Sequence, residues 1–273
     1  DNEGLKERSE SAIRDGLRQL GYLPYPIGFS MPRLALPESM LVMGIWFVRI
    51  TRRRAVVGVH LPVIVMLHTQ KHQVFAWLPH DGRIRPYYQA LLDITQLDPE
   101  QVKRCKRQDA LRQVQQFLLG DATRQGVNDI AIFANAQNAR STWHGLYNTE
   151  VLFDALRFER GERPLSTKML PVRFRLIRLR TNLREETPEW YVPGSTPSKT
   201  AQGLWTEQDV DEKTTRLFYS IAGKPHTAPK KYVGKQLKPR ENYRTSSIVE
   251  TMPLILHEDD DPAMWAIAVD QWR

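Results

Sequence analysis

Short runs of apolar residues, separated by polar turns, predict strands and helices along most of the chain. Three segments rich in β-branched and aromatic residues follow one another with short connections, at 41–50, 55–67 and 73–78. Short connections favour an antiparallel meander. The continuous apolar run 129–133, bounded by turn residues, is typical of a strand buried in the middle of a sheet.

Apolar residues at helical spacing predict five helices, over 9–20, 86–94, 98–119, 139–147 and 262–273. Asp261 is the expected cap of the last helix. Three further strands are predicted over 170–179, 203–206 and 215–221, the last two as a hairpin. The proline-containing stretch 22–37 interrupts the pattern, so we expect an N-terminal helix with its linker over 1–37 and one domain over 38–273.

The order of these elements predicts the fold class. A meander of three strands is followed by helices that alternate with single strands. This order fits an α/β protein with the ribonuclease H-like (RNase H-like) mixed sheet, in which three antiparallel strands are extended by parallel strands and helices flank the sheet. The strand at 129–133 is then expected to lie parallel to the first strand of the meander.

Composition narrows the classes of protein that remain. Among 273 residues 41% are hydrophobic, which is enough for a sizeable core, and the single cysteine excludes a disulfide framework or a zinc site built on cysteine pairs. No apolar run approaches the length of about 20 residues that spans a bilayer, so we expect no membrane contact and a cytoplasmic location. The chain begins at Asp1 without a methionine, which indicates a domain of a longer protein.

Charge points to nucleic acid as a partner. Lys and Arg total 39 against 31 Asp and Glu, a formal net charge of +8. The basic residues cluster at 49–54, 173–184 and 224–244. One such cluster alone is more often a solvated surface, but three favour a surface that follows a phosphate backbone. The predicted contacts from the last two clusters are Arg178, Arg180, Lys230, Lys231, Lys235, Lys238 and Arg240.

Three blocks of sequence carry a resemblance to a known family. The blocks are LVMGIWFVRITRRRAVVG, DIAIFANAQNARSTW and DDDPAMWAIAVDQWR, and they follow one another in this order. They resemble the PIWI domain of Argonaute-type proteins, and within that group the C-terminal RNase H-like domain of the prokaryotic pPIWI-RE family, named for a characteristic Arg and Glu. The resemblance covers about 41–273 and implies a domain of a prokaryotic defence protein that holds RNA or DNA guide and target strands, with helicase or nuclease partners.

The resemblance also implies where metal ligands would stand. Active PIWI domains cut the target with two metal ions held by carboxylates. In this sequence Trp46, two residues after Gly44, occupies the first ligand position, Asn135 the second and Ile267 the third. The resemblance therefore implies an inactive nuclease without a metal cofactor. Two alternatives stay open: a Mg²⁺- or Mn²⁺-dependent nuclease with an unorthodox site, and an interaction module that does not touch nucleic acid. The residues considered for that unorthodox site are Asp129, Asp259, Asp260 and Asp270.

The family's defining pair is assigned to Arg140 and Glu250. Arg140 follows the end of a strand, where substrate faces an RNase H-like sheet, and its guanidinium is suited to a bidentate phosphate contact. Glu250 precedes the last helix. Other acids compete for this place, namely Glu150, Glu186 and Glu189, and a structural Arg–Glu pair that bridges loops is an equal alternative.

Overall fold

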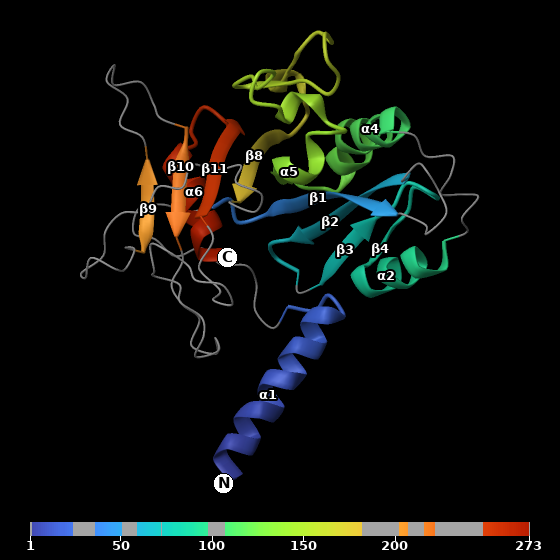
Figure 1. The fold of residues 1–273 in the computed structure, drawn as a ribbon, viewed down its shortest axis with the longest axis vertical. Coiled ribbons are helices and arrows are strands. Elements are labelled where there is room, and N and C mark those ends of the chain that lie inside the picture. Colours follow the sequence, from blue (N-terminus) through green and yellow to red (C-terminus); the bar gives the residue numbers. More distant parts are fainter. Residues whose placement is uncertain are drawn as a thin grey trace, which may run out of the picture.

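The structure is a computed structural model that describes residues 2–23, 36–50, 59–71, 73–97, 107–181, 202–206, 216–221 and 248–272. Its main feature is a nine-stranded mixed sheet in the order β4-β3-β2-β1-β5-β8-β11-β10-β9 (Figure 1). The strands are β1 (Met40–Ile50), β2 (Val59–His68), β3 (Val74–Trp77), β4 (Ile84–Pro86), β5 (Asp129–Asn135), β8 (Arg173–Thr181), β9 (Gly203–Thr206), β10 (Phe218–Ile221) and β11 (Ile248–Ile255). A separate pair consists of β6 (Ala155–Leu156) and β7 (Leu165–Ser166).

The sheet confirms the predicted RNase H-like topology. β1, β2 and β3 pair antiparallel, as the short connections predicted. β5 lies parallel to β1 on its other side, and β8 lies parallel to β5. β11 pairs antiparallel with β8, and β9 and β10 form the expected antiparallel hairpin. The mixed sheet therefore has its parallel part in the centre.

The longer helices among the described residues are α1 (Asn2–Gln19), α2 (Tyr87–Gln96), α4 (Arg107–Gln116) and α6 (Pro262–Trp272). α4 runs on into a π-helical turn, Phe117–Asp121, and a 3-10 turn, Ala122–Arg124. The predicted cap of α6 is confirmed, since Oδ1 of Asp261 accepts a hydrogen bond from the backbone nitrogen of Ala263. Part of the helix expected at 98–119 lies outside the described residues.

Two expectations about single elements were wrong or incomplete. The segment 139–147 is not one helix: the chain forms a single turn, α5 (Ala136–Ala139), and a separate 3-10 turn, His144–Leu146. At Gly145 a Cβ would lie 2.1 Å from the carbonyl oxygen of Arg157, so the backbone here passes too close to another segment for a regular helix. β11 was not predicted as a strand, because a proline in the middle of a segment argues against one. The register shift between Pro253 and Ile255 accommodates that proline.

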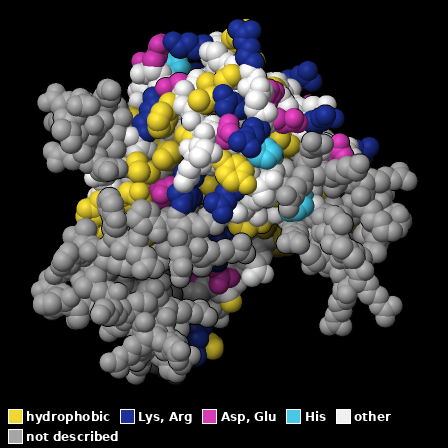
Figure 2. All heavy atoms as spheres, turned by 45° about the horizontal axis from the view of Figure 1, so that its top comes forward, with side chains coloured by type: hydrophobic (Ala, Val, Ile, Leu, Met, Phe, Trp, Pro, Cys, Tyr) yellow, Lys and Arg dark blue, Asp and Glu magenta, His cyan; other side chains and the backbone are white. Residues whose placement is uncertain are grey.

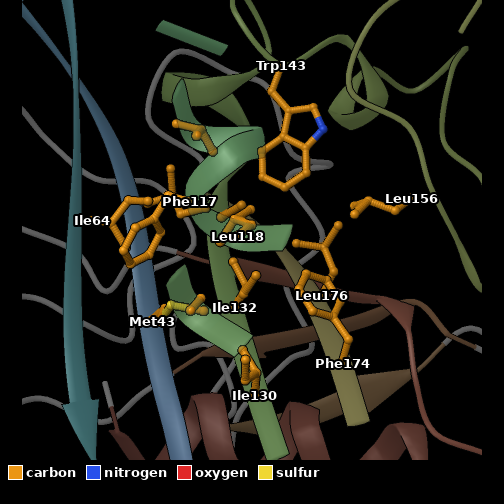
Figure 3. Close-up of a cluster of buried hydrophobic side chains, with 14 of the residues drawn as sticks. Met43, Ile64, Phe117, Leu118, Ile130, Ile132, Trp143, Leu156, Phe174 and Leu176 are labelled. Atoms are coloured by element: carbon orange, nitrogen blue, oxygen red, sulfur yellow. The ribbon is translucent and has the colours of Figure 1, made fainter. Parts of the chain in front are cut away.

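The two faces of the sheet bury different clusters. Residues paired across strands lie on the same face, so Met43, Ile132 and Leu176 all point to one side. There they pack under α4 and Trp143, and we call this side the α4 face (Figure 3). On the opposite side, the α6 face, Trp265 of α6 packs on Ile177.

α2 packs on the α6 face as well, but over β2 and β3. Val63 of β2 and Ala76 of β3 are buried with Ala90 of α2. Val63 is the register partner of Trp46, which places α2 and α6 on the same side of the sheet. The α6 face is therefore covered by two helices on either side of β1.

α1 extends away from the sheet in Figure 1, with Leu5 and Ile13 exposed. The division at residue 37 between an N-terminal segment and the domain stays a prediction. None of the helices in the described ranges is long and apolar enough to span a membrane.

Candidate functional site

The candidate site lies at the carboxyl end of β5, which is shorter than the two strands beside it, β1 and β8. β5 ends at Asn135, whereas β1 continues to Ile50 and β8 to Thr181. Oδ1 of Asn135 caps α5 by accepting a hydrogen bond from the backbone nitrogen of Asn138 at 3.1 Å. The chain therefore turns into α5 between two strands that run on.

Side-chain amides of α5 take the place of the missing strand. The Asn138 amide accepts from the backbone nitrogen of Phe47 at 2.7 Å and donates to its carbonyl oxygen at 2.9 Å. On the other side, Oε1 of Gln137 accepts from the backbone nitrogen and from the hydroxyl of Thr181, both at 3.0 Å. These bonds satisfy backbone groups that the sheet would otherwise leave unpaired. α5 therefore bridges β1 and β8 beyond the end of β5. In open α/β sheets, ligands bind at the carboxyl ends of the strands.

An open strip lies next to this gap on the α6 face, between the helices α2 and α6. Trp46 of β1 has 49% of its surface exposed, although β1 has strands on both sides. Gly44 is also exposed, and a Cβ at this position would have no atom within 4 Å. The central strand β1 is thus accessible on this face, through the backbone at Gly44 and the indole ring of Trp46.

Two of the three positions assigned to metal ligands come together here. Ile45 pairs with Ala134 in parallel register, so the next residues, Trp46 and Asn135, follow side by side on the α6 face. The third, Ile267, lies on α6 and is half-buried. The two positions that come together hold an indole and an amide that caps a helix, and the third holds an alkyl group.

The carboxylates considered for an unorthodox site do not assemble there. Asp129 is the first residue of β5, at the end opposite to Asn135. Both Asp129 and Asp260 accept hydrogen bonds from Arg175. Asp259 is exposed next to a histidine, and Asp270 lies on α6. Within the described ranges no three His, Cys, Asp or Glu side chains form a group suited to a metal ion.

Asp129 and Asp260 form ion pairs with Arg173 and Arg175, and we call these four residues the Arg175 clamp. Arg175 donates to Asp129 at 2.7 Å and to the two oxygens of Asp260 at 2.5 and 2.9 Å. Arg173 donates to the second oxygen of Asp129 at 2.7 Å. The Arg175 guanidinium also lies 5.4 Å from the ring centre of Trp265.

Electrostatics favour a structural role for the clamp. Burial alone lowers the pKa of Arg175, but its bonds to Asp260 and Asp129 outweigh burial and raise the pKa above its ordinary value. Two guanidinium groups face two carboxylates, so the charges balance. The clamp ties β5 and β8 to the segment before α6.

A second network of arginines lies on the α4 face. It consists of Arg178, Arg180 and Glu250, and we call it the Arg178 cluster. Arg178 donates to Oε1 of Glu250 at 3.1 Å, and Arg180 donates to both oxygens of Glu250 at 3.3 Å. Arg178 also donates to the carbonyl oxygen of Leu146 at 3.0 Å and to the side chain of Asn148. One buried carboxylate therefore serves two arginines.

The arginines of this cluster affect one another. Burial lowers the pKa of Arg178, Glu250 raises it, and the neighbouring Arg180 and Arg140 lower it again, to about 10 in all. A group with this pKa is still protonated at neutral pH. Arg140, the C-cap residue of α5, thus lies close enough to Arg178 to lower its pKa.

The assigned pair Arg140 and Glu250 therefore falls in one region, with Arg178 between them. The alternative of an Arg–Glu pair that bridges loops needs correction, because the contact joins two adjacent strands, β8 and β11. Of the competing acids, Glu150 pairs elsewhere, with Arg157 and Arg160. Sequence reasoning listed Arg178 among phosphate contacts and missed it as the partner of Glu250, since β11 was not recognised as a strand.

Other predicted contacts remain untested. The basic residues of the third cluster, Lys230, Lys231, Lys235, Lys238 and Arg240, lie outside the described residues. On the side of the molecule seen in Figure 2, described Lys and Arg side chains are interspersed with acidic and apolar ones. A role in binding must therefore be argued from particular sites.

The chain was compared with family models, with proteins of curated function and with solved structures. The family model described as the RNaseH domain of pPIWI_RE matches residues 42–273. No protein of curated function matches the chain. A crystal structure of Marinitoga piezophila Argonaute in complex with a 5′ OH guide RNA is similar over 84% of this chain and 25% of its own, with 8% identity and a TM-score of 0.30. The chain thus spans about a quarter of the length of that Argonaute.

Proposed function

Because the chain belongs to the family of RNaseH domains of pPIWI_RE proteins, we propose that it holds guide or target nucleic acid within a longer PIWI-type protein without cutting it. The observation that carries this proposal is that Asn135, at the carboxyl end of β5, lies beside Trp46 of β1, at positions where active PIWI domains need aspartates. A role in prokaryotic defence, beside helicase or nuclease partners, is part of the same proposal.

The residues at this place do not fit a pair of Mg²⁺ or Mn²⁺ ions. Hard divalent cations prefer several charged oxygen ligands and dehydrate reluctantly. The indole of Trp46 offers no oxygen, and Oδ1 of Asn135 already accepts the capping hydrogen bond of α5. Trp46 and Asn135 therefore do not supply the carboxylate ligands that cleavage by two metals needs.

Binding is supported by the position of the cationic groups. Arg180 lies one residue beyond Leu179, the register partner of Asn135, so it stands where β5 has ended. Arg140 follows α5 in the same gap. Guanidinium groups recognise phosphate through paired hydrogen bonds, which makes this end of the sheet suited to a phosphate backbone.

The test combines binding and cleavage on the same samples. The 273-residue chain is incubated with end-labelled guide–target duplexes of RNA and DNA, in Mg²⁺, in Mn²⁺ and in chelator. We expect binding whose affinity falls steeply as salt rises, because phosphate contacts release counterions. We expect no cleavage product under any of the three conditions.

Two outcomes would overturn the proposal. Absence of salt-dependent binding would remove nucleic acid as the ligand and favour the interaction module. Metal-dependent cleavage would replace the silent domain by a nuclease. Asp270→Asn is the informative control in that case, because Asp270 lies outside the Arg175 clamp and its replacement leaves those ion pairs intact.

A further inference from the structure

We propose that Trp46 is a stacking platform for one unpaired base of the bound strand. The proposal rests on the function proposed above and deepens it, since it names the chemical group that occupies the open strip on the α6 face. The occupant is a nucleobase of a single-stranded segment. Stacking is available to every base, so this contact carries no sequence preference.

The surroundings of Trp46 leave room for a flat ring. Gly44 lies two residues earlier on the same face, and no atom lies within 4 Å of the position that its Cβ would take. Gly44 pairs with Phe133, whose ring packs against Trp272 with ring centres 5.7 Å apart. The strip is thus flat at Gly44 and has aromatic side chains at Trp46 and Phe133.

The indole also stands next to the cationic gap. Phe47, the next residue, is bonded through both of its backbone groups to Asn138, two residues before Arg140. The Trp46 ring lies on the α6 face, whereas Arg140 lies near Arg178 of the α4 face, so one strand would reach both by passing over the carboxyl end of β5.

An unpaired base fits this site better than a duplex does. Bases inside a duplex stack on one another and present only their edges, whereas bases of a single strand can be splayed out onto aromatic rings. The chain has a formal net charge of +8, which attracts a polyanion and repels a basic partner. We therefore favour a single strand over a protein segment.

The experiment measures affinity of the chain for a single-stranded oligonucleotide and for the matching duplex. Trp46→Ala is expected to weaken single-strand binding about 5- to 140-fold, the range found when one stacking ring is removed, and to change duplex binding little. Trp46→Phe, which retains a ring, is expected to recover most of the affinity. Phe153→Ala is the matched control, because Phe153 is an equally exposed ring (53%) outside this strip.

A second variant tests the strip without removing the indole. Gly44→Leu places an alkyl group in open space beside Trp46 and is expected to reduce single-strand affinity while the thermal unfolding temperature stays unchanged. An oligonucleotide that carries 5-iodouracil is expected to cross-link at Trp46 on irradiation, as located by mass spectrometry.

The results separate the two proposals. If the wild-type chain binds with salt dependence, but Trp46→Ala and Gly44→Leu bind equally well and no cross-link forms at Trp46, stacking is wrong and nucleic-acid binding stands. If the wild-type chain does not bind at all, both proposals fail. Cross-linking at Trp46 together with unchanged duplex binding supports the platform.

Discussion

Arg175 and Arg178 lie three residues apart on β8, both with 2% of their surface exposed, yet they occupy opposite faces and different electrostatic surroundings. Arg175 bonds with two aspartates, and the pKa of its guanidinium is raised. Arg178 shares one glutamate with Arg180, and burial with two cationic neighbours lowers its pKa to about 10. Two equally buried arginines thus have different partners: Arg175 bonds with two carboxylates, whereas Arg178 shares one carboxylate with a second arginine.

The difference teaches which network serves the fold and which is suited to a ligand. Removing charges from water costs several kcal/mol per ion, and a network that repays the cost internally gains nothing from an added anion. The Arg175 clamp is of this kind. In the Arg178 cluster two arginines share one glutamate among the described residues, which makes the cluster the better candidate for binding an added phosphate.

The two networks also differ in their place along the sheet. Arg175 pairs with Ala131 in the middle of β5, and its partner Asp129 begins that strand. Arg178 pairs with Ala134, and Arg180 lies past the last residue of β5. The Arg175 clamp therefore lies toward the amino end of the parallel strands, and the Arg178 cluster lies toward the carboxyl end. The open strip with Trp46 also lies toward the carboxyl end, but on the α6 face.

The largest expected effect is on stability, from Arg175→Met. The change leaves Asp260 and half of Asp129 buried without a cationic partner, and we expect a loss of about 3–5 kcal/mol in the free energy of unfolding. Urea denaturation monitored by circular dichroism measures it. Arg173→Met is the control, because Arg173 contacts the same aspartate with a half-exposed side chain, and we expect a loss of about 1 kcal/mol or less. Equal losses in the two variants would contradict the reading of Arg175 as the centre of the clamp.

A smaller effect on stability and a clear effect on binding are expected from Arg180→Met. Glu250 keeps its bond to Arg178, and a like charge near Arg178 is removed, so the free energy of unfolding should change by about 1 kcal/mol or less. Nucleic-acid affinity should fall, and the slope of log affinity against log salt should become shallower by about one. Filter binding at several salt concentrations tests this. An unchanged slope would show that Arg180 contacts no phosphate.

A third prediction concerns the stabilisation of the folded chain by inorganic phosphate. If the Arg178 cluster accepts an anion, phosphate at tenfold its dissociation constant should stabilise the folded chain by about 1.4 kcal/mol, which corresponds to a rise of a few degrees in Tm. Chloride at equal ionic strength is the reference. The rise should disappear in Arg180→Met and persist in Arg173→Met, and a rise of equal size in all three proteins would assign it to general salt effects.

The sequence by itself determined the meander, the buried strand β5 and the family. These elements depend on local patterns, such as the apolar run 129–133 and the short connections between the first three strands, which act on the chain wherever it lies. The assignment of ligand positions to Trp46 and Asn135 stays a prediction, which rests on blocks of sequence whose order carries the resemblance.

Only the tertiary structure decided how the polar residues pair. β11 carries Glu250 and Pro253, a pattern that argues against a strand, and the sheet holds it because β8 and β10 bond to it on both sides. The partners Arg178 and Glu250 are 72 residues apart in the chain, so neither their contact nor the sharing of Glu250 with Arg180 follows from spacing. Charge balance is a property of the folded neighbourhood, since burial and distance decide which carboxylate compensates which guanidinium.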